Sequence, residues 1–412
     1  MSTFNLLYPA FQKFYSALNS LNRFSKEKNF FDNISSLDTF FSEFRNVTFV
    51  LQKSLANTQY ISVYEKNRDK YLSEFRWFVE KRNEITKEHP FRLIKQIDIT
   101  IYLPGKSFNV FSKKFTIEDD VEISTLIEKF KELFINVNPV EVFFSAKFSF
   151  LEKESNNDIW DQIFHGIQKM RIFLDVMEKE INTHCTLNEK LKQEIDQFPF
   201  FSVHKDFLLV NDYVYYPKKD IFESAGRVVL KMEGQNKTIS RMPLSCFDKG
   251  LFAKIGGDYF EKFVVMHVIL HSTDLLPAIM IIYNDNTFEL DAFNADIKTT
   301  MYRKINETAN QILTEEVKEV YFMIIYRSYP LSLEYINMTA VERSVYTQFE
   351  LMVFTKIDCE LNVEEYVFDG RYIKCKEYIS RQLRFGRKKK LDISINNMLP
   401  IIKAFKKRKE HV

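Results

Sequence analysis

The sequence predicts an α+β protein of several domains: an N-terminal all-α helical bundle with a small α/β insertion, followed by a mixed α/β domain. Three observations lead to this prediction. The chain has 412 residues, more than one typical core accommodates. Apolar residues recur at helical spacing through residues 1–90, and period-two alternation begins only after Phe91. Hydrophobic residues make up 45% of the chain and charged residues 28%, as in ordinary globular proteins.

The first 90 residues predict three long helices. Apolar side chains follow i, i+3 and i+4 spacing over residues 3–23, about 33–57 and about 62–89. Ser and Asp near the start of the second segment are suitable helix caps. Because the connections are short and polar, we expect the three helices to be antiparallel neighbours in a bundle.

The next hundred residues predict strands within a helical context. QIDITIYL (96–103) and VEVFFSAKFSFL (140–151) alternate with period two, and the helical pattern STLIEKFKELF (124–134) lies between them. Residues 157–195 return to helical spacing. We expect this last helix to complete a four-helix bundle over 1–198, with about 92–152 inserted into it. Two separate small domains are the alternative.

Residues 199–370 predict the mixed α/β domain. A hairpin with an Asn-Asp-Asn turn, one helix and three strands follow in order, at 277–293, about 296–314, 319–327, 347–357 and 364–369. The remaining segment, 371–412, has 14 Lys and Arg against three Asp and Glu, a net charge of +11. This excess favours a polyanion such as nucleic acid, or an acidic partner. A solvated basic helix is the alternative.

Several functional classes are disfavoured. With nine Gly and no G-x-G-x-x-G or Gly-Lys-Ser/Thr, dinucleotide-binding and P-loop enzymes are not expected. The four cysteines form no C-x-x-C pair, which indicates neither a zinc knuckle nor a disulfide framework. His267 and His271 have i, i+4 spacing but lack the acidic residue of an H-E-x-x-H motif, so we expect no metal and no cofactor. Without a signal peptide or an 18-residue apolar run, we expect a cytoplasmic protein with no membrane contact.

The stretch WFVEKRNEITKEHPF places polar residues where a packed helix needs apolar ones. Phe78 and Ile85 belong to the apolar stripe, but Arg82 takes the position between them. His89 follows one turn after Ile85, and Pro90 then ends the helix. A dry core does not tolerate an unpaired charge, so Arg82 is either paired or faces a wet cleft or a partner. An anion held between Arg82 and His89 accounts for both residues; an Arg at the bundle rim and a His without a ligand are the alternative.

This combination resembles the HEPN family, all-α domains of bacterial toxins and defence ribonucleases. Its signature is Arg, a polar residue, three to five further residues and His, at or near the end of a bundle helix. Here Arg82, Asn83, five further residues and His89 match the long form of that spacing. The resemblance covers residues 1–90 and 157–195 at most, and it says nothing of 200–412.

The resemblance implies metal-independent RNA cleavage by a toxin or a phage-defence effector of the abortive-infection kind. In this family two protomers each contribute a motif helix to one composite active site. A second copy of the chain, in a homodimer, and RNA are therefore the partners that the resemblance implies. Arg82 would bind the scissile phosphate, His89 would act on the 2′-hydroxyl or the leaving oxygen, and Asn83 would hold both in place. An antitoxin or a phage trigger protein is a further partner that the resemblance allows. The alternative is a catalytically inactive HEPN-like scaffold subunit of a defence or toxin-antitoxin complex.

Further basic residues are second-rank candidates for binding RNA. Arg45 and Asn46 flank the apolar stripe of the second helix, although Arg45 is equally suited to pair with Glu43 or Glu74 of a neighbouring turn or helix. The run RQLRFGRKKK would lay cations along phosphates and stack a base on its Phe. Its candidate residues are Arg384, Arg387, Lys388 and Lys389.

Overall fold

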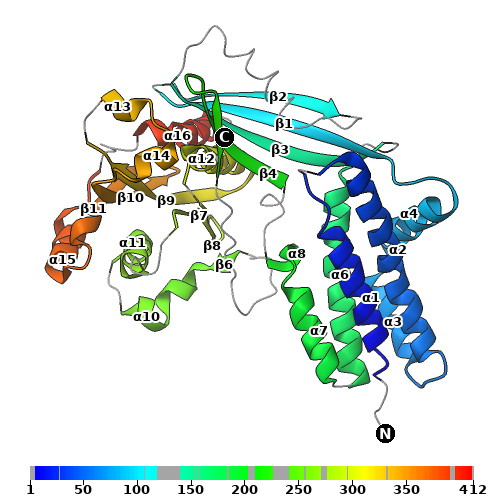
Figure 1. Ribbon diagram of the computed structural model, residues 1–412. Helices are drawn as coiled ribbons and strands as arrows, with labels where there is room; N and C mark the ends of the chain where they lie inside the picture. The colour runs from blue at the N-terminus through cyan, green and yellow to red at the C-terminus, as the bar shows by residue number, and fades with distance from the viewer. Residues whose placement is uncertain are drawn as a thin grey trace.

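The computed structural model describes the chain from residue 5 to residue 410, except for 27, 106, 118–139, 154, 156, 183–184, 203–208, 226–240, 255–256, 271–275, 295, 331–332 and 390–394. Figure 1 shows a helical bundle, a five-stranded sheet that extends over it, and a six-stranded sheet on the far side of the molecule. All strand pairs of the described residues are antiparallel. The predicted α+β class is therefore confirmed.

The bundle combines helices from two parts of the chain. Its members are α1 (Tyr8–Leu21), α2 (Phe30–Leu55), α3 (Ile61–Tyr71), α6 (Ile159–Ile181) and α7 (Thr186–Asp196). α1 packs along α2 and α7, and α3 packs along α6. The chain after residue 157 therefore returns to the first helices, as the sequence predicts.

Two of the predicted helices are each divided in two. The segment 62–89 is not one helix, because α3 ends at Tyr71 and α4 (Arg76–Lys87) begins only after a turn. Leu72 and Phe75, at the two ends of this turn, are both buried in the bundle core. The segment 157–195 is interrupted at Asn182, whose φ of 51° is the left-handed conformation that ends α6. Helical spacing continues across both breaks, so periodicity alone could not reveal them.

The five-stranded sheet lies between two hydrophobic cores. Its strands are β1 (Leu93–Leu103), β2 (Asn109–Ile117), β3 (Val142–Glu152), β4 (Val210–Tyr216) and β5 (Ile221–Ser224), in the order β2-β1-β3-β4-β5. Phe144 and Phe148 of β3 belong to the bundle core. Phe143 points to the other face, where its ring lies 5.1 Å from that of Tyr302. Alternation along each strand thus divides the side chains between the two cores.

The six-stranded sheet forms the rest of the second core. Its strands are β6 (Met242–Pro243), β7 (Ala278–Tyr283), β8 (Thr287–Ala292), β9 (Val317–Ser328), β10 (Phe349–Asp358) and β11 (Val363–Asp369), in the order β11-β10-β9-β7-β8-β6. One face contacts α12 (Lys298–Thr314) and α16 (Ile395–Glu410). The other face packs on α11 (Tyr259–Leu270) and α15 (Lys376–Phe385). The predicted hairpin, helix and three strands of this region are all present.

The C-terminal basic segment contains part of this core. Met398, Ile401 and Phe405 of α16 are buried against α12 and both sheets. Arg408, also on α16, donates hydrogen bonds to the carbonyls of Ile312 and Glu315 at the end of α12. Residues 371–412 therefore include a packed helix as well as a charged surface.

The predicted boundaries near 198 and 370 remain predictions. Strand pairing crosses the first, since β3 pairs with β4, and core packing crosses the second through α16. The predicted helix 124–134 lies outside the described residues. None of the described helices is long and apolar enough to span a membrane.

Candidate functional site

The candidate motif lies on α4, which an aromatic cluster fixes to the bundle. Phe78 is the buried residue of this helix, and its ring centroid is 4.7 Å from that of Phe44 on α2. The same ring meets α6 at Gly166, where an added Cβ would lie 2.2 Å from the Phe78 Cζ atom. Gly166 therefore allows α4 to approach α6 closely, and the position of the motif depends on that approach.

Arg82 lies half-buried on α4 and has no acidic partner among the described residues. Its Nη1 donates a hydrogen bond to Asn83 Oδ1 at 3.1 Å. The neighbouring Lys81, by contrast, forms ion pairs with Glu84 at 2.7 Å and with the buried Glu152 of β3. Glu84 and Glu152 are thus bound by Lys81, and the Arg82 guanidinium keeps donors for an external anion.

His89 follows the end of α4, and its ring lies beside a backbone carbonyl. α4 ends at Lys87, and the backbone N–H of His89 still donates to the Glu84 carbonyl at 3.2 Å. The ring Nδ1 lies 3.0 Å from the Pro90 carbonyl oxygen, which only accepts hydrogen bonds. In the neutral ring the proton therefore belongs on Nδ1, and the lone pair of Nε2 is left as a base.

The chain immediately after His89 is fixed to α2. The Phe91 N–H donates to Asp38 Oδ1 at 3.1 Å, and the Phe91 ring stacks on that of Phe41 with centroids 5.4 Å apart. Burial raises the pKa of the Asp38 carboxyl above its usual value, although the Phe91 hydrogen bond opposes this shift. The backbone that carries His89 is therefore restrained on both sides, by α4 and by α2.

The structure brings Arg82, Asn83 and His89 to the same end of one helix, but it forms no direct bond between Arg82 and His89. No hydrogen bond or ion pair among the described residues joins their side chains. Because the two side chains do not bond to each other, both can contact different atoms of one ligand. The assignment of the three residues as a site remains a prediction.

Arg45 and Asn46 lie half-buried on α2, away from contact with the α4 motif. Arg45 Nη1 donates to Thr48 Oγ1 of the same helix at 2.5 Å. Glu43 and Glu74, the alternative partners of Arg45, lie within ion-pair distance of side chains on α1 and α6 instead. No bond of the described chain connects Arg45 to the end of α4, so its role in RNA binding remains a prediction.

The basic candidates of the C-terminal segment have different environments. Arg387 is held by three carboxylates, through ion pairs to Asp258 at 2.6 Å, to Glu261 at 3.4 Å and to Glu364. Burial alone would lower the pKa of Arg387, but the bonds to Asp258 and Glu364 outweigh it and raise that pKa. Arg384 and Lys389 are exposed, and Lys388 pairs with Glu365 through backbone hydrogen bonds. Arg387 is therefore bound by carboxylates of the fold, whereas Arg384 and Lys389 are exposed to solvent.

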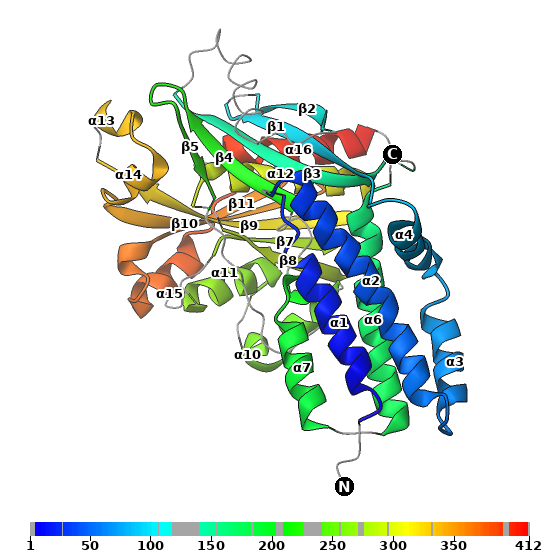
Figure 2. The same ribbon diagram turned by 45° about the vertical axis from the view of Figure 1, so that its right-hand side comes forward.

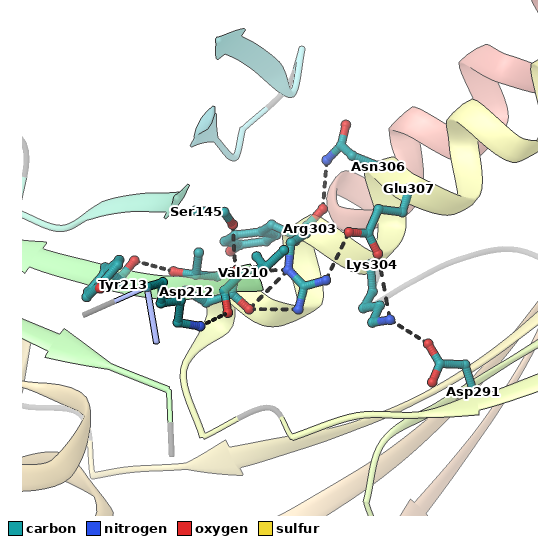
Figure 3. A network of polar contacts seen from close by, with 12 residues as sticks. Ser145, Val210, Asp212, Tyr213, Asp291, Arg303, Lys304, Asn306 and Glu307 are labelled. Carbon is teal, nitrogen blue, oxygen red and sulfur yellow. Dashed lines mark hydrogen bonds and ion pairs between the residues drawn. The ribbon is translucent and has the colours of Figure 1, made fainter. Parts of the chain in front are cut away.

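The sequence did not predict a buried polar network near α12. Figure 3 shows Arg303 of α12 between Asp212 of β4 and Glu307 one turn further on. The Arg303 Nε and Nη2 atoms donate to Asp212 at 2.9 and 3.0 Å, and Ser145 Oγ donates to the same carboxylate at 2.6 Å. Lys304 continues the network to Asp291. Because Asp212 and Arg303 are 91 residues apart, no local pattern could have paired them.

This network is structural in character. The Asp212 side chain is 4% exposed and that of Arg303 is 14% exposed. Burial alone would lower the pKa of Arg303, but Asp212 and Glu307 outweigh it and raise that pKa. The bidentate geometry satisfies the planar guanidinium, so the network links the five-stranded sheet to α12 rather than presenting a reactive group.

The described residues contain no cluster of three or more His, Cys, Asp or Glu that could hold a metal ion. His267 lies buried in α11, with Nδ1 2.8 Å from the Phe263 carbonyl and its ring against Phe263 and Phe354. Burial lowers the pKa of His267, which indicates a neutral core residue. His271 lies outside the described residues.

No protein-family model, curated protein or solved structure matches this chain.

Proposed function

We propose that the chain is a metal-independent endoribonuclease that acts as a toxin or phage-defence effector through Arg82, Asn83 and His89. The observation that supports this most directly is the free guanidinium of Arg82 beside a lysine that is paired twice. A cation that is half-buried, oriented by Asn83 and left without a carboxylate is suited to a phosphate. The Nε2 lone pair of His89 supplies the base that the reaction needs.

The chemistry follows from these two groups. The Arg82 guanidinium binds the non-bridging oxygens of the scissile phosphate and stabilises the charge that develops on them. His89 Nε2 takes the proton of the 2′-hydroxyl, whose oxygen attacks phosphorus and displaces the 5′-oxygen of the next nucleotide. The products are a 2′,3′-cyclic phosphate and a 5′-hydroxyl; the base His89 ends as imidazolium, and a second His89 that starts as imidazolium protonates the leaving oxygen. That second histidine comes from the other protomer of the proposed homodimer.

The decisive experiment compares RNA cleavage and thermal stability in Arg82→Ala and His89→Ala. We expect each variant to lose about 100-fold or more in cleavage rate, because charge stabilisation or proton transfer is removed. Stability should change by less than about 1 kcal/mol, since neither side chain has a partner in the core. Arg76→Ala is the matched control, because Arg76 is an exposed arginine of the same helix whose one ion pair within the described residues is with Glu80. Folded variants that cleave RNA at the wild-type rate would reject the assignment.

A binding-only scaffold is the second candidate, and exposed aromatic residues on α2 favour it. Phe31 and Phe49 are 74% and 46% exposed. They are 18 residues apart, which is about five helical turns, so they share one face of α2. Expression in a host distinguishes the two candidates, because an active ribonuclease without its neutraliser arrests growth and a scaffold does not.

A further inference from the structure

α15 has one face on the six-stranded sheet and one face in solvent. Tyr378, Ile379 and Leu383 pack against the core of that sheet. Arg381, Arg384 and Phe385 are exposed, and helical spacing places them together on the opposite side. We call this side, with the flanking lysines Lys374, Lys376 and Lys389, the α15 outer face. It is a basic surface with an aromatic residue in it.

The cations of the α15 outer face have no acidic partners. Among the described residues, neither Arg381 nor Arg384 forms an ion pair, and the same holds for the three flanking lysines. The acids nearby are taken, because Asp258, Glu261 and Glu364 all bind Arg387. Glu377 is the one acidic residue of α15 itself. The surface therefore keeps a net positive charge that the fold does not neutralise.

Phe385 adds a feature that structural stability does not explain. Its side chain is 75% exposed, and the Arg384 guanidinium lies 5.9 Å from the ring centroid. A nucleobase stacks on such a ring while adjacent arginines bind the phosphates on either side. This combination selects unpaired nucleotides, because a base inside a duplex does not offer its face.

We propose that the α15 outer face binds single-stranded RNA, with Phe385 as a stacking platform and Arg381 and Arg384 as phosphate ligands. The choice of RNA as the nucleic acid rests on the proposed function. An anionic membrane fits less well, because Phe385 is the one large apolar side chain exposed on α15 itself, and a single ring offers little area for insertion.

The α15 outer face is separate from the candidate active site. Figures 1 and 2 both show α15 and α4 on opposite sides of the molecule. A bound strand would therefore be captured at α15 and cleaved elsewhere. Removing the α15 cations should raise KM for RNA and leave kcat unchanged.

The test measures binding without cleavage, on the full chain carrying His89→Ala. A fluorescein-labelled oligouridine of about 20 nucleotides, longer than a typical single-strand site, is titrated at several salt concentrations. We expect Arg381→Ala/Arg384→Ala to make the slope of log K against log salt less negative by about 1.4, because two phosphate contacts are lost. Phe385→Ala should weaken binding by about tenfold or more without changing the slope.

The matched control is Lys179→Ala/Lys190→Ala, which removes two exposed lysines of α6 and α7 that have no ion-pair partner in the described structure. It changes the net charge equally and should leave both affinity and slope as they were. Any of three results would overturn the proposal. The salt slope of the arginine variant could be unchanged, the lysine control could show an equal effect, or the chain could bind phosphatidylserine vesicles and not RNA. If the wild-type chain, with His89 intact, does not cleave the same RNA while α15-dependent binding persists, the proposed function alone is overturned.

Discussion

Adjacent residues of α4 receive different surroundings from the fold. Lys81 and Arg82 are both cations on the same turn, yet Lys81 reaches Glu152 at the end of β3, whereas the Arg82 guanidinium bonds only Asn83 among the described residues. The sequence places Arg82 on the apolar stripe but does not show which of the two is neutralised. That difference is decided by β3, whose last residue lies about 70 positions further along the chain. Long-range contacts therefore determine which charged residue is available for a ligand.

Asp212 is the residue on which the network of Figure 3 depends, and its removal should be costly. We expect Asp212→Ala to lower the free energy of unfolding by about 3–5 kcal/mol, because Arg303 would stay buried without its main partner. Chemical denaturation of the purified variant measures this loss.

Two further variants test the cause. Asp291→Ala removes the exposed end of the same network, 56% exposed, and should cost less than about 1 kcal/mol. The double variant Asp212→Leu/Arg303→Met should recover most of the stability, since an apolar pair replaces a buried ion pair at similar volume. A single Asp212→Ala variant as stable as the wild type would show that the network carries no such energy.

At the scale of elements, α16 is the clearest test of the fold. We expect Phe405→Ala to destabilise the protein by about 3–5 kcal/mol, because its fully enclosed ring leaves a cavity between α12 and the sheets. Lys406→Ala, at the next and exposed position, should change stability by less than about 0.5 kcal/mol. Thermal or chemical unfolding of both variants provides the comparison, and equal effects would mean that α16 does not pack as described.

The elements were predictable where one pattern decides them. Period-two alternation predicted β1 and β3, whose side chains are divided between two cores. β9 and β10 were predictable as apolar runs rich in strand-forming residues. The break at Asn182 was not predictable, since asparagine in a left-handed conformation leaves the helical spacing around it intact. In the sequence, α16 looks like part of a charged segment because five of its 16 residues are Lys or Arg, and these hide the spacing of Met398, Ile401 and Phe405 that pack it.

The candidate site was predictable only as a pattern. Spacing singled out Arg82, Asn83 and His89 because they interrupt an apolar stripe. The free state of Arg82 and the tautomer of His89 depend on contacts with Glu152 and with the Pro90 carbonyl, which spacing does not encode. The α15 outer face was predictable only in part. The run of basic residues indicated a basic surface, but it could not show that Arg387 is bound by carboxylates while Arg384 is exposed to solvent.

For the whole molecule, the proposed reaction predicts a homodimer. A composite site needs a second His89 to protonate the leaving oxygen, so two α4 ends must face each other. Light scattering at micromolar concentration should therefore give twice the mass of one chain, and dilution should reduce mass and specific activity together. A monomer that retains full cleavage activity would contradict this prediction.

The shared five-stranded sheet also has a consequence for synthesis of the chain. Tyr102 and Phe143 leave the ribosome early, but the helices that cover them, α12 and α16, are made much later. Lys403 reaches back to the Ser107 carbonyl across 296 positions, which shows how late this face is closed. Until then one face of the sheet is uncovered, while the other already packs on the bundle core, where α6 contacts β3. During most of translation the nascent chain therefore exposes an aromatic surface to other chains. A chain truncated before α16 would keep this surface exposed and be prone to aggregate.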